Sequence, residues 1–155
     1  MPPEMRKAKV RDLPEIARLN NLEAQYAGER DQTFFKRYLK IPYFLVSEDP
    51  RGLSGFIMVM SPQVEYDSPN FGWFQKNIPS FIYIDRVIVR QDVRNNGIAS
   101  AFYQKLEEER GRIPLTAEVS ILNENSMSFH LRRGFHEIGR FAADGKKECI
   151  MLKKD

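Results

Sequence analysis

The segment Phe81–Leu106 constrains the fold more than any other part of the sequence. Phe81–Val89 is rich in β-branched and aromatic residues and predicts a buried central strand. A polar turn that contains a glycine follows at Arg90–Gly97. Apolar residues then recur at helical spacing, at Ile98, Ala101, Phe102 and Leu106. A strand that passes through a turn directly into a helix favours a mixed α/β chain.

The turn itself predicts an anion site at Arg94–Ser100. Successive backbone N–H groups at a helix N-terminus form a concave site whose helix dipole favours negative charge. Gly97 lets the backbone approach a phosphate without a Cβ in the way, and Arg94 can add a charged donor. An ordinary strand-to-helix turn has the same composition, so this string alone leaves both interpretations open.

The N-terminal part predicts a short strand, Met5–Val10, followed by a helix. Asp12 and Glu15 have the spacing of a capping box, and Pro14 is tolerated in a first turn. The apolar face of this helix is predicted from residues at helical spacing: Ile16, Leu19, Leu22 and Tyr26.

The remaining elements complete one mixed domain. A helix is predicted at Thr33–Leu39, and Ser61–Ser80 is a long loop with at most one short helix. A further helix is predicted at Asn125–Arg133. Strands are predicted at Tyr43–Ser47, Leu53–Met60, Pro114–Ser120, Phe135–Phe141 and Lys147–Leu152. Repeats and linkers are absent from the sequence, so we expect a single α/β (α+β) domain over residues 1–155.

Composition narrows the class of protein. A chain of 155 residues with 42% hydrophobic residues can bury an ordinary core, and its only cysteine, Cys149, can form no internal disulfide. No Cys/His spacing suggests a metal site. The N-terminus is charged and the clearest apolar run, Phe56–Met60, is far too short for a membrane span. We therefore expect a cytoplasmic protein that does not bind a membrane.

Two segments resemble the signatures of the GNAT superfamily of N-acetyltransferases. Ile84–Ala99 is similar to its central strand, pyrophosphate loop and following helix. Asn123–Phe135 is similar to its second signature, in which an Asn precedes a helix with an aromatic pair that Gly-Phe closes. The resemblance extends from about Val10 to Leu152, and Tyr66–Asn70 looks like an uncharacterised bacterial branch.

The resemblance implies a twisted, mostly antiparallel sheet with splayed central strands, flanked by helices, that holds acetyl-CoA. Arg94 and the backbone N–H groups of Asn95, Asn96, Gly97, Ile98, Ala99 and Ser100 would bind the pyrophosphate. Main-chain groups of the central strand (Val87, Ile88 and Val89) would pair with the pantetheine arm and meet the reacting carbonyl oxygen. Asn123, with Ser126 beside it, would contact the end of that arm.

Two residues are candidates for the proton transfers. An alkylamine is ionised at neutral pH and must lose a proton before it can attack a thioester. Asp85 stands where many members of the family carry an acidic residue, but it can equally be paired with Arg86. His130 occupies the place of a tyrosine that protonates the leaving thiolate, and a capping or packed histidine is an equal alternative.

Candidate substrate residues lie in the first helix and in the long loop. Asn20 and Asn21 are poor helix formers in the helix that lines the acceptor pocket of the family, although a solvated face explains them too. Tyr66 and Trp73, with Phe71 and Phe74, would wall that pocket or pack down the loop. We expect the Ser61–Ser80 segment to border the acceptor site, with edge cover or a dimer contact as the alternative.

The sequence therefore predicts an acetyl-CoA-dependent N-acetyltransferase that acts by direct transfer in a ternary complex. Cys149 lies away from the motifs, which gives a covalent acetyl-enzyme no support. The acceptor is a small-molecule or peptide amine, and a homodimer is possible. An acyl-CoA-binding sensor or interaction module without turnover is the main alternative. Nucleic-acid binding is disfavoured because 24 basic residues are spread evenly against 21 acidic ones.

Overall fold

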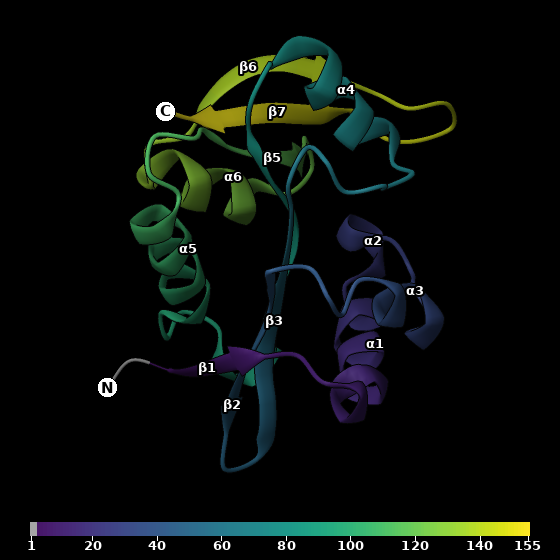
Figure 1. Ribbon diagram of the computed structural model, residues 1–155, viewed down its shortest axis with the longest axis vertical. Helices are drawn as coiled ribbons and strands as arrows, with labels where there is room; N and C mark the ends of the chain where they lie inside the picture. The colour runs from purple at the N-terminus through teal and green to yellow at the C-terminus, as the bar shows by residue number, and fades with distance from the viewer. Residues whose placement is uncertain (1–2) are drawn as a thin grey trace. The chain divides into compact units, whose positions relative to one another are not determined.

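The computed structural model describes residues 3–155 (Figure 1). In chain order the elements are β1 (Glu4–Lys7), η1 (Val10–Asp12), α1 (Leu13–Leu22), α2 (Ala24–Ala27), α3 (Gln32–Arg37), β2 (Tyr43–Asp49), β3 (Gly52–Met60), α4 (Pro69–Asn77), β4 (Ile82–Val89), η2 (Gln91–Val93), α5 (Ile98–Glu109), β5 (Leu115–Ser120), α6 (Glu124–Arg132), β6 (His136–Phe141) and β7 (Cys149–Lys154). Each predicted strand and helix is present. The short helix α2 is an addition to the predicted order, and α4 is the one short helix that the prediction allowed within the long loop.

The strands form one seven-stranded sheet in the order β1-β2-β3-β4-β5-β7-β6. β1 and β2, β2 and β3, β5 and β7, and β6 and β7 pair antiparallel. β4 and β5 run parallel, and their ladder joins Ile82 to Leu115 and Tyr83 to Thr116, at the start of both strands. This confirms the predicted mixed fold with a mostly antiparallel sheet flanked by helices.

The chain packs into two compact units. The first holds the described residues up to Val59 together with Arg86–Glu109, and the second holds Met60–Asp85 and Arg110–Asp155. The single domain predicted from the sequence stays a prediction. Within residues 3–155, no helix is both long and apolar enough to cross a membrane.

Helices cover both faces of the strands in the first unit. α1, α2 and α3 lie on one side of β2 and β3, and α5 lies on the other (Figure 1). The core is aromatic: Phe35, Phe44 and Phe56 are fully buried, and the ring centroids of Phe35 and Phe56 are 5.6 Å apart. Aromatic burial of this kind supplies much of the hydrophobic stabilisation of a small unit.

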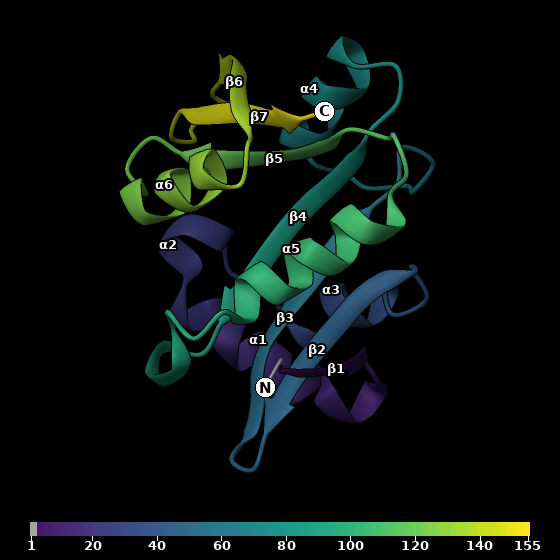
Figure 2. The ribbon, with the colours of Figure 1, turned by 90° about the vertical axis from the view of Figure 1, so that its left-hand side faces the viewer.

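The second unit packs α4 and α6 on opposite faces of β5, β7 and β6 (Figures 1 and 2). Beneath α4, the buried rings of Phe71 and Phe74 surround Tyr83, with centroid distances of 5.3 and 5.6 Å. Trp73 lies over Gly139 of β6, where an added Cβ would come within 2.7 Å of the indole. A glycine is thus needed in this strand because α4 approaches it so closely.

The start of α1 differs from the prediction. The side chain of Asp12 does not cap α1: its Oδ2 accepts a hydrogen bond from the Lys9 N–H (2.8 Å), and both carboxylate oxygens accept from Arg6. Glu15 pairs with Arg18 instead of completing a capping box. The predicted capping box is therefore wrong, because a nearby arginine and the preceding turn both use the Asp12 carboxylate.

The predicted apolar face of the first helix is correct for only half its length. Ile16 and Leu19 are buried, but α1 ends at Leu22, which is 66% exposed. Tyr26 belongs to α2 and is 45% exposed. Helical periodicity alone could not reveal the break at Glu23.

The long loop contains a helix with ordinary start signals. Ser68 is its N-cap and accepts from the Phe71 N–H, and Pro69 occupies the first turn, where its missing N–H costs nothing. The remaining loop, residues 61–68, leads from β3 to this helix.

Candidate active site

The turn before α5 has the backbone shape of an anion site. Asn95 and Gly97 both have left-handed backbones, with φ of 65° and 82°. Alternation of left-handed and right-handed residues turns consecutive N–H groups toward one side. Among residues 3–155, no partner accepts from the N–H groups of Asn95, Asn96 or Gly97. The 12-residue helix α5 begins directly after them at Ile98, so its dipole adds to the same site.

The space at Gly97 is open. A Cβ built on Gly97 meets nothing within 4 Å, so the positive φ and not crowding inside the protein is what calls for glycine. The loop residues Arg94–Gly97 are mostly exposed. An anion can therefore reach the backbone from solvent.

The base of this loop is held by β3 and by one arginine. A Cβ on Gly55 of β3 would lie 2.7 Å from the Ile88 carbonyl oxygen, which is closer than real Cβ contacts, so β3 and β4 need glycine there. Arg90 bonds the carboxylates of Asp49 and Asp92, and its Nη1 donates to the Leu53 carbonyl (2.8 Å). These contacts tie the end of β4 to the β2–β3 hairpin and fix where the loop begins. Figure 2 shows α5 leaving this point along β3 and β4.

Arg94 already has a carboxylate partner. Its guanidinium forms an ion pair with Glu23, which joins α1 and α2, and its Nε donates to the Val89 carbonyl at 3.3 Å. The side chain is 42% exposed. A bound anion would compete with Glu23 for this arginine.

The two asparagines of α1 hold neighbouring backbone in place. Asn20 is fully buried; its Nδ2 donates to the Gly28 carbonyl (2.9 Å), and its Oδ1 accepts from Arg86 Nη1 (3.0 Å). Asn21 bonds both the N–H and the carbonyl of Arg30, each at 2.9 Å. Both amides thus position the segment after α2. Direct contact of either with substrate stays a prediction.

Arg86 is buried on the face of β4 that α1 and α3 cover. Its guanidinium lies over the Phe34 ring, 5.1 Å from the centroid, besides the hydrogen bond to Asn20. Stacking and hydrogen bonding together make burial of this charge tolerable.

The second unit gathers two carboxylates and two tyrosines. The Tyr66 hydroxyl donates to Asp85 Oδ1 at 2.7 Å, and the Tyr83 hydroxyl donates to Glu118 Oε1 at 2.7 Å. Asn70 of α4 also donates to Glu118 Oε1, at 3.2 Å. The loop residue Tyr66 thus contacts Asp85. A role of this loop at the acceptor site stays a prediction.

Glu118 is the functional candidate that the sequence analysis missed. Its Oε2 is buried without a hydrogen-bond partner among residues 3–155. Burial and the neighbouring charge of Asp85 raise the pKa of Glu118 to about 7. The hydrogen bonds from Tyr83 and Asn70 lower this pKa and so offset part of the rise. A carboxyl group with a pKa near neutrality is suited to proton transfer. The available signal was an acidic residue between Ala117 and Val119 in the middle of a predicted strand.

His130 lies in the same unit, at the end of α6. It is 3% exposed, and its Nδ1 lies 2.7 Å from the Ser126 carbonyl oxygen, to which it donates. Burial lowers the pKa of His130 to about 4, so the imidazole is neutral at pH 7 with its proton on Nδ1. This arrangement favours the packed alternative, since a neutral ring has no proton on Nε2 to donate. The acid role stays a prediction.

The other predicted residues have local packing roles. Asn123 caps α6, and its Oδ1 accepts from the Ser126 N–H at 3.2 Å. Phe71 and Phe74 pack on Tyr83, and Trp73 packs on Gly139. Cys149 lies in β7, as predicted, and burial raises the pKa of its thiol to about 11.

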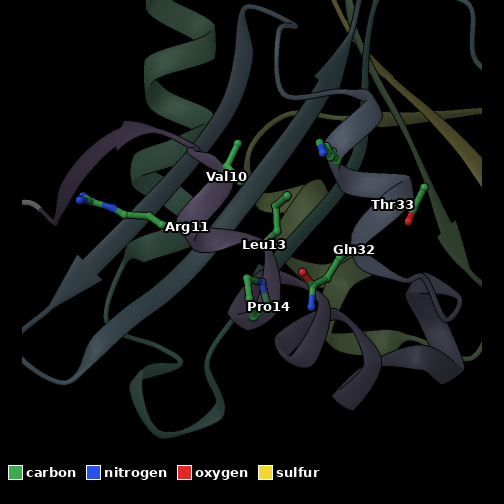
Figure 3. Close-up of a pocket in the computed structure, with 7 residues that line it drawn as sticks. Val10, Arg11, Leu13, Pro14, Gln32 and Thr33 are labelled. Atoms are coloured by element: carbon green, nitrogen blue, oxygen red, sulfur yellow. The ribbon is translucent and has the colours of Figure 1, made fainter.

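An open hollow of about 310 Å³ lies elsewhere in the first unit (Figure 3). It is lined by residues from η1 and the starts of α1 and α3: Val10, Arg11, Leu13, Pro14, Gln32, Thr33 and Lys36. In Figure 3 the Arg11 side chain points away from Gln32 and Thr33. The predicted site residues do not line this hollow.

Comparison with known proteins gives one family and one fold. The model of the acetyltransferase (GNAT) family matches residues 11–135. No curated protein matches the chain by sequence.

Solved structures of N-acetyltransferases resemble the chain over nearly its whole length. The ribosomal-protein-S18-alanine N-acetyltransferase of Escherichia coli has a TM-score of 0.70 at 15% identity, over 97% of this chain and 92% of that one. Ard1 of Thermoplasma volcanium has a TM-score of 0.77 at 16% identity, over 99% and 97%. Naa20 of Chaetomium thermophilum, in complex with a bisubstrate analogue, has a TM-score of 0.76 at 20% identity, over 97% of this chain and 85% of that one. At these identities the likeness shows a shared fold.

Proposed function

The chain belongs to the acetyltransferase (GNAT) family, and on that premise we propose that it transfers an acetyl group from acetyl-CoA to a primary amine by direct attack in a ternary complex. The observation that carries the proposal is the loop before α5. Its left-handed Asn95 and Gly97, its unpartnered N–H groups and the helix behind it fit a pyrophosphate.

Several residues would hold the cofactor. The N–H groups of Asn95–Ser100 would bind the pyrophosphate, and Arg94 would exchange Glu23 for a phosphate oxygen. Main-chain groups of Val87, Ile88 and Val89 would pair with the pantetheine arm, and Asn123 with Ser126 would meet its far end. Acetyl-CoA supplies a thioester carbon at which an amine can attack.

The chain itself must remove a proton from the acceptor. An alkylammonium has no lone pair, so one N–H proton has to leave before or during attack. Asp85 and Glu118 are the two carboxylates of the second unit that accept hydrogen bonds from tyrosines, and the pKa of Glu118 near 7 allows it to take up a proton at neutral pH. The phenyl rings of Phe71 and Phe74, which pack on Tyr83, would keep water from this region.

The departing thiolate needs a proton as well. His130 can give one only if it first receives it, because its pKa of about 4 leaves the ring neutral at pH 7. When His130 is neutral, the thiolate would take its proton from water, or it would take the proton that the acceptor has released. Cys149 is protonated at neutral pH because burial raises its pKa to about 11, which agrees with direct transfer without an acetylated cysteine.

The proposal leaves the class of amine acceptor unspecified, and the names of the solved neighbours suggest which amines to assay first. One solved neighbour is, by its name, a ribosomal-protein-S18-alanine N-acetyltransferase. We therefore propose a panel of a peptide with N-terminal alanine, a lysine peptide, free amino acids, a polyamine and an aminoglycoside.

The test measures free CoA thiol and the mass of the acetylated product for each amine. We expect one class to give both signals, and the variant Gly97→Asp to lose both. If the wild-type protein binds CoA by calorimetry but acetylates no amine of the panel, the chain is instead an acyl-CoA-binding module without turnover.

A further inference from the structure

We propose that Tyr66 and Asp85 form a positioning pair that holds a negative charge beside Glu118 and thereby makes Glu118 the group that takes the proton from the acceptor amine. The proposal rests on the acetyl transfer proposed above. It assigns different roles to Asp85 and Glu118. Asp85 then acts through Glu118 and is not itself the base.

Strand register places the two carboxylates together. The parallel ladder pairs Tyr83 of β4 with Thr116 of β5. Asp85 and Glu118 follow these residues by two positions on their own strands, so each lies on the same face as the paired residue before it. The two acids thus occupy equivalent positions directly beyond the end of the ladder.

Each carboxylate has its own phenol. Tyr66 donates to Asp85 Oδ1 and Tyr83 donates to Glu118 Oε1, both at 2.7 Å, and the two rings touch with centroids 6.5 Å apart. Phe71, which is 1% exposed, packs against Tyr66 at 5.8 Å. The charge of Asp85 is therefore fixed in place by a hydroxyl whose own ring is anchored.

The surroundings of Glu118 make Asp85 the charge that matters. From β4 it faces Tyr83 and Asp85, and from α4 it faces Asn70. From β7 its neighbour is Cys149, which is uncharged at neutral pH because its pKa is raised to about 11. Asp85 is thus a charged neighbour that raises the pKa of Glu118.

The proton balance favours this division. The N–H proton of the acceptor passes to the unpartnered Oε2 of Glu118, and the nitrogen lone pair is left to attack the thioester. Protonation of Glu118 also removes its repulsion with Asp85. The negative charge of Asp85 therefore favours transfer of the proton to Glu118. Solvent then takes this proton before the next turnover.

The decisive experiment follows the Glu118 carboxyl by NMR in full-length protein labelled with ¹³C at glutamate side chains. The signal is assigned with Glu118→Gln, and its titration is compared in wild type, Asp85→Asn and Tyr66→Phe. We expect Asp85→Asn to lower the midpoint by about one pH unit, because a like charge is removed. Tyr66→Phe keeps the charge of Asp85 but removes the hydroxyl that holds this carboxylate in place. The titration midpoint of Glu118 should therefore fall by less than in Asp85→Asn. The matched control Asp67→Asn removes an exposed acid next to Tyr66 and should not move it.

Kinetics supply a second readout once an acceptor is found. The acid limb of kcat/KM should move to lower pH in Asp85→Asn together with the NMR midpoint, whereas a residue with a purely structural role would lower the rate without moving the limb. A Glu118 midpoint unchanged in Asp85→Asn overturns the proposal. If no amine is acetylated, the proposed function fails, and the NMR titration still decides whether Asp85 controls Glu118.

Discussion

Asn95 is the one residue other than glycine with a left-handed backbone among residues 3–155, and it stands two positions before Gly97. Asparagine tolerates this conformation better than other non-glycine residues, because its short polar side chain bonds locally. Two left-handed residues this close together give the loop its concave row of N–H groups. A change at either position is therefore expected to act on the proposed cofactor site before it acts on the core.

Gly97→Asp should abolish acetyl-CoA binding, since it sets a side chain and a like charge against the pyrophosphate. Its positive φ adds backbone strain of roughly 1–2 kcal/mol. Gly111→Asp is the matched control, because Gly111 also has a positive φ (64°) and open space around an added Cβ. Calorimetry should detect binding to the control and none to Gly97→Asp. Affinity within about threefold of wild type, a difference below 1 kcal/mol, would contradict the loop assignment.

His130→Phe separates the acid role from packing. An acid that protonates the thiolate contributes about 10²–10⁴-fold, so its loss should cost well over tenfold in kcat with little change in CoA affinity. Phenylalanine keeps most of the ring volume between Phe129 and Phe135, whose centroids lie 5.3 and 5.1 Å from the imidazole. Stopped assays of CoA release give the rate. A loss of less than about threefold would assign His130 to packing.

At the scale of elements, a close contact between strands and an ion network set the position of the loop. Gly55 lies where β2 and β3 shift register, and there β3 approaches the Ile88 carbonyl. A bulge with glycine brings backbones closer than side chains would permit. Arg90 then ties the following turn to the hairpin through Asp49 and Asp92.

Gly55→Ala should destabilise the protein and weaken acetyl-CoA binding together. The added methyl would lie 2.7 Å from a backbone oxygen that no side-chain rotation can move, at a cost of about 1–3 kcal/mol. Urea unfolding and calorimetry measure the two effects. Gly72→Ala in α4 is the control, since its Cβ meets nothing within 4 Å, and it should leave the affinity unchanged. A fully stable Gly55→Ala variant would contradict the close approach.

Elements were predicted better than their ends and their partners. Patterns within a few residues, such as the predicted strands Phe81–Val89 and Leu53–Met60, depend on local sequence and were correct. The Asp12 cap failed because Arg6 of another element takes the carboxylate. Glu118 was missed because its significance comes from Asp85 and Tyr83 on the neighbouring strand, and a sequence without strand order does not bring these residues together.

At the scale of the whole molecule, two buried groups with opposite shifts shape the stability. The folded pKa of Glu118, about 7 against an ordinary 4.5, means that the folded state binds more protons between these values, so stability falls as pH rises. The folded pKa of His130, about 4 against 6.5, means the reverse, and stability rises with pH over that range. Between about pH 4.5 and 6.5 the two slopes largely cancel.

Single substitutions should uncover each slope. The free energy of unfolding of Glu118→Gln should rise from about pH 4.5 to 6.5, by an amount on the order of 3 kcal/mol, and that of His130→Phe should fall by a similar amount. Urea unfolding at several pH values measures both. Flat curves for both variants would show that neither group has the shifted pKa described here.

The contact between Trp73 and Gly139 provides an optical probe of half the molecule. Trp73 is the only tryptophan of the chain, and it belongs to the second unit, so intrinsic fluorescence excited at the indole band reports the docking of α4 on β6. Far-ultraviolet circular dichroism, by contrast, is dominated by helices from both units. Coincident melting curves by the two signals would mark a single cooperative transition. An earlier fluorescence change would mean that the unit containing Asp85 and Glu118 loosens while the loop before α5 stays folded.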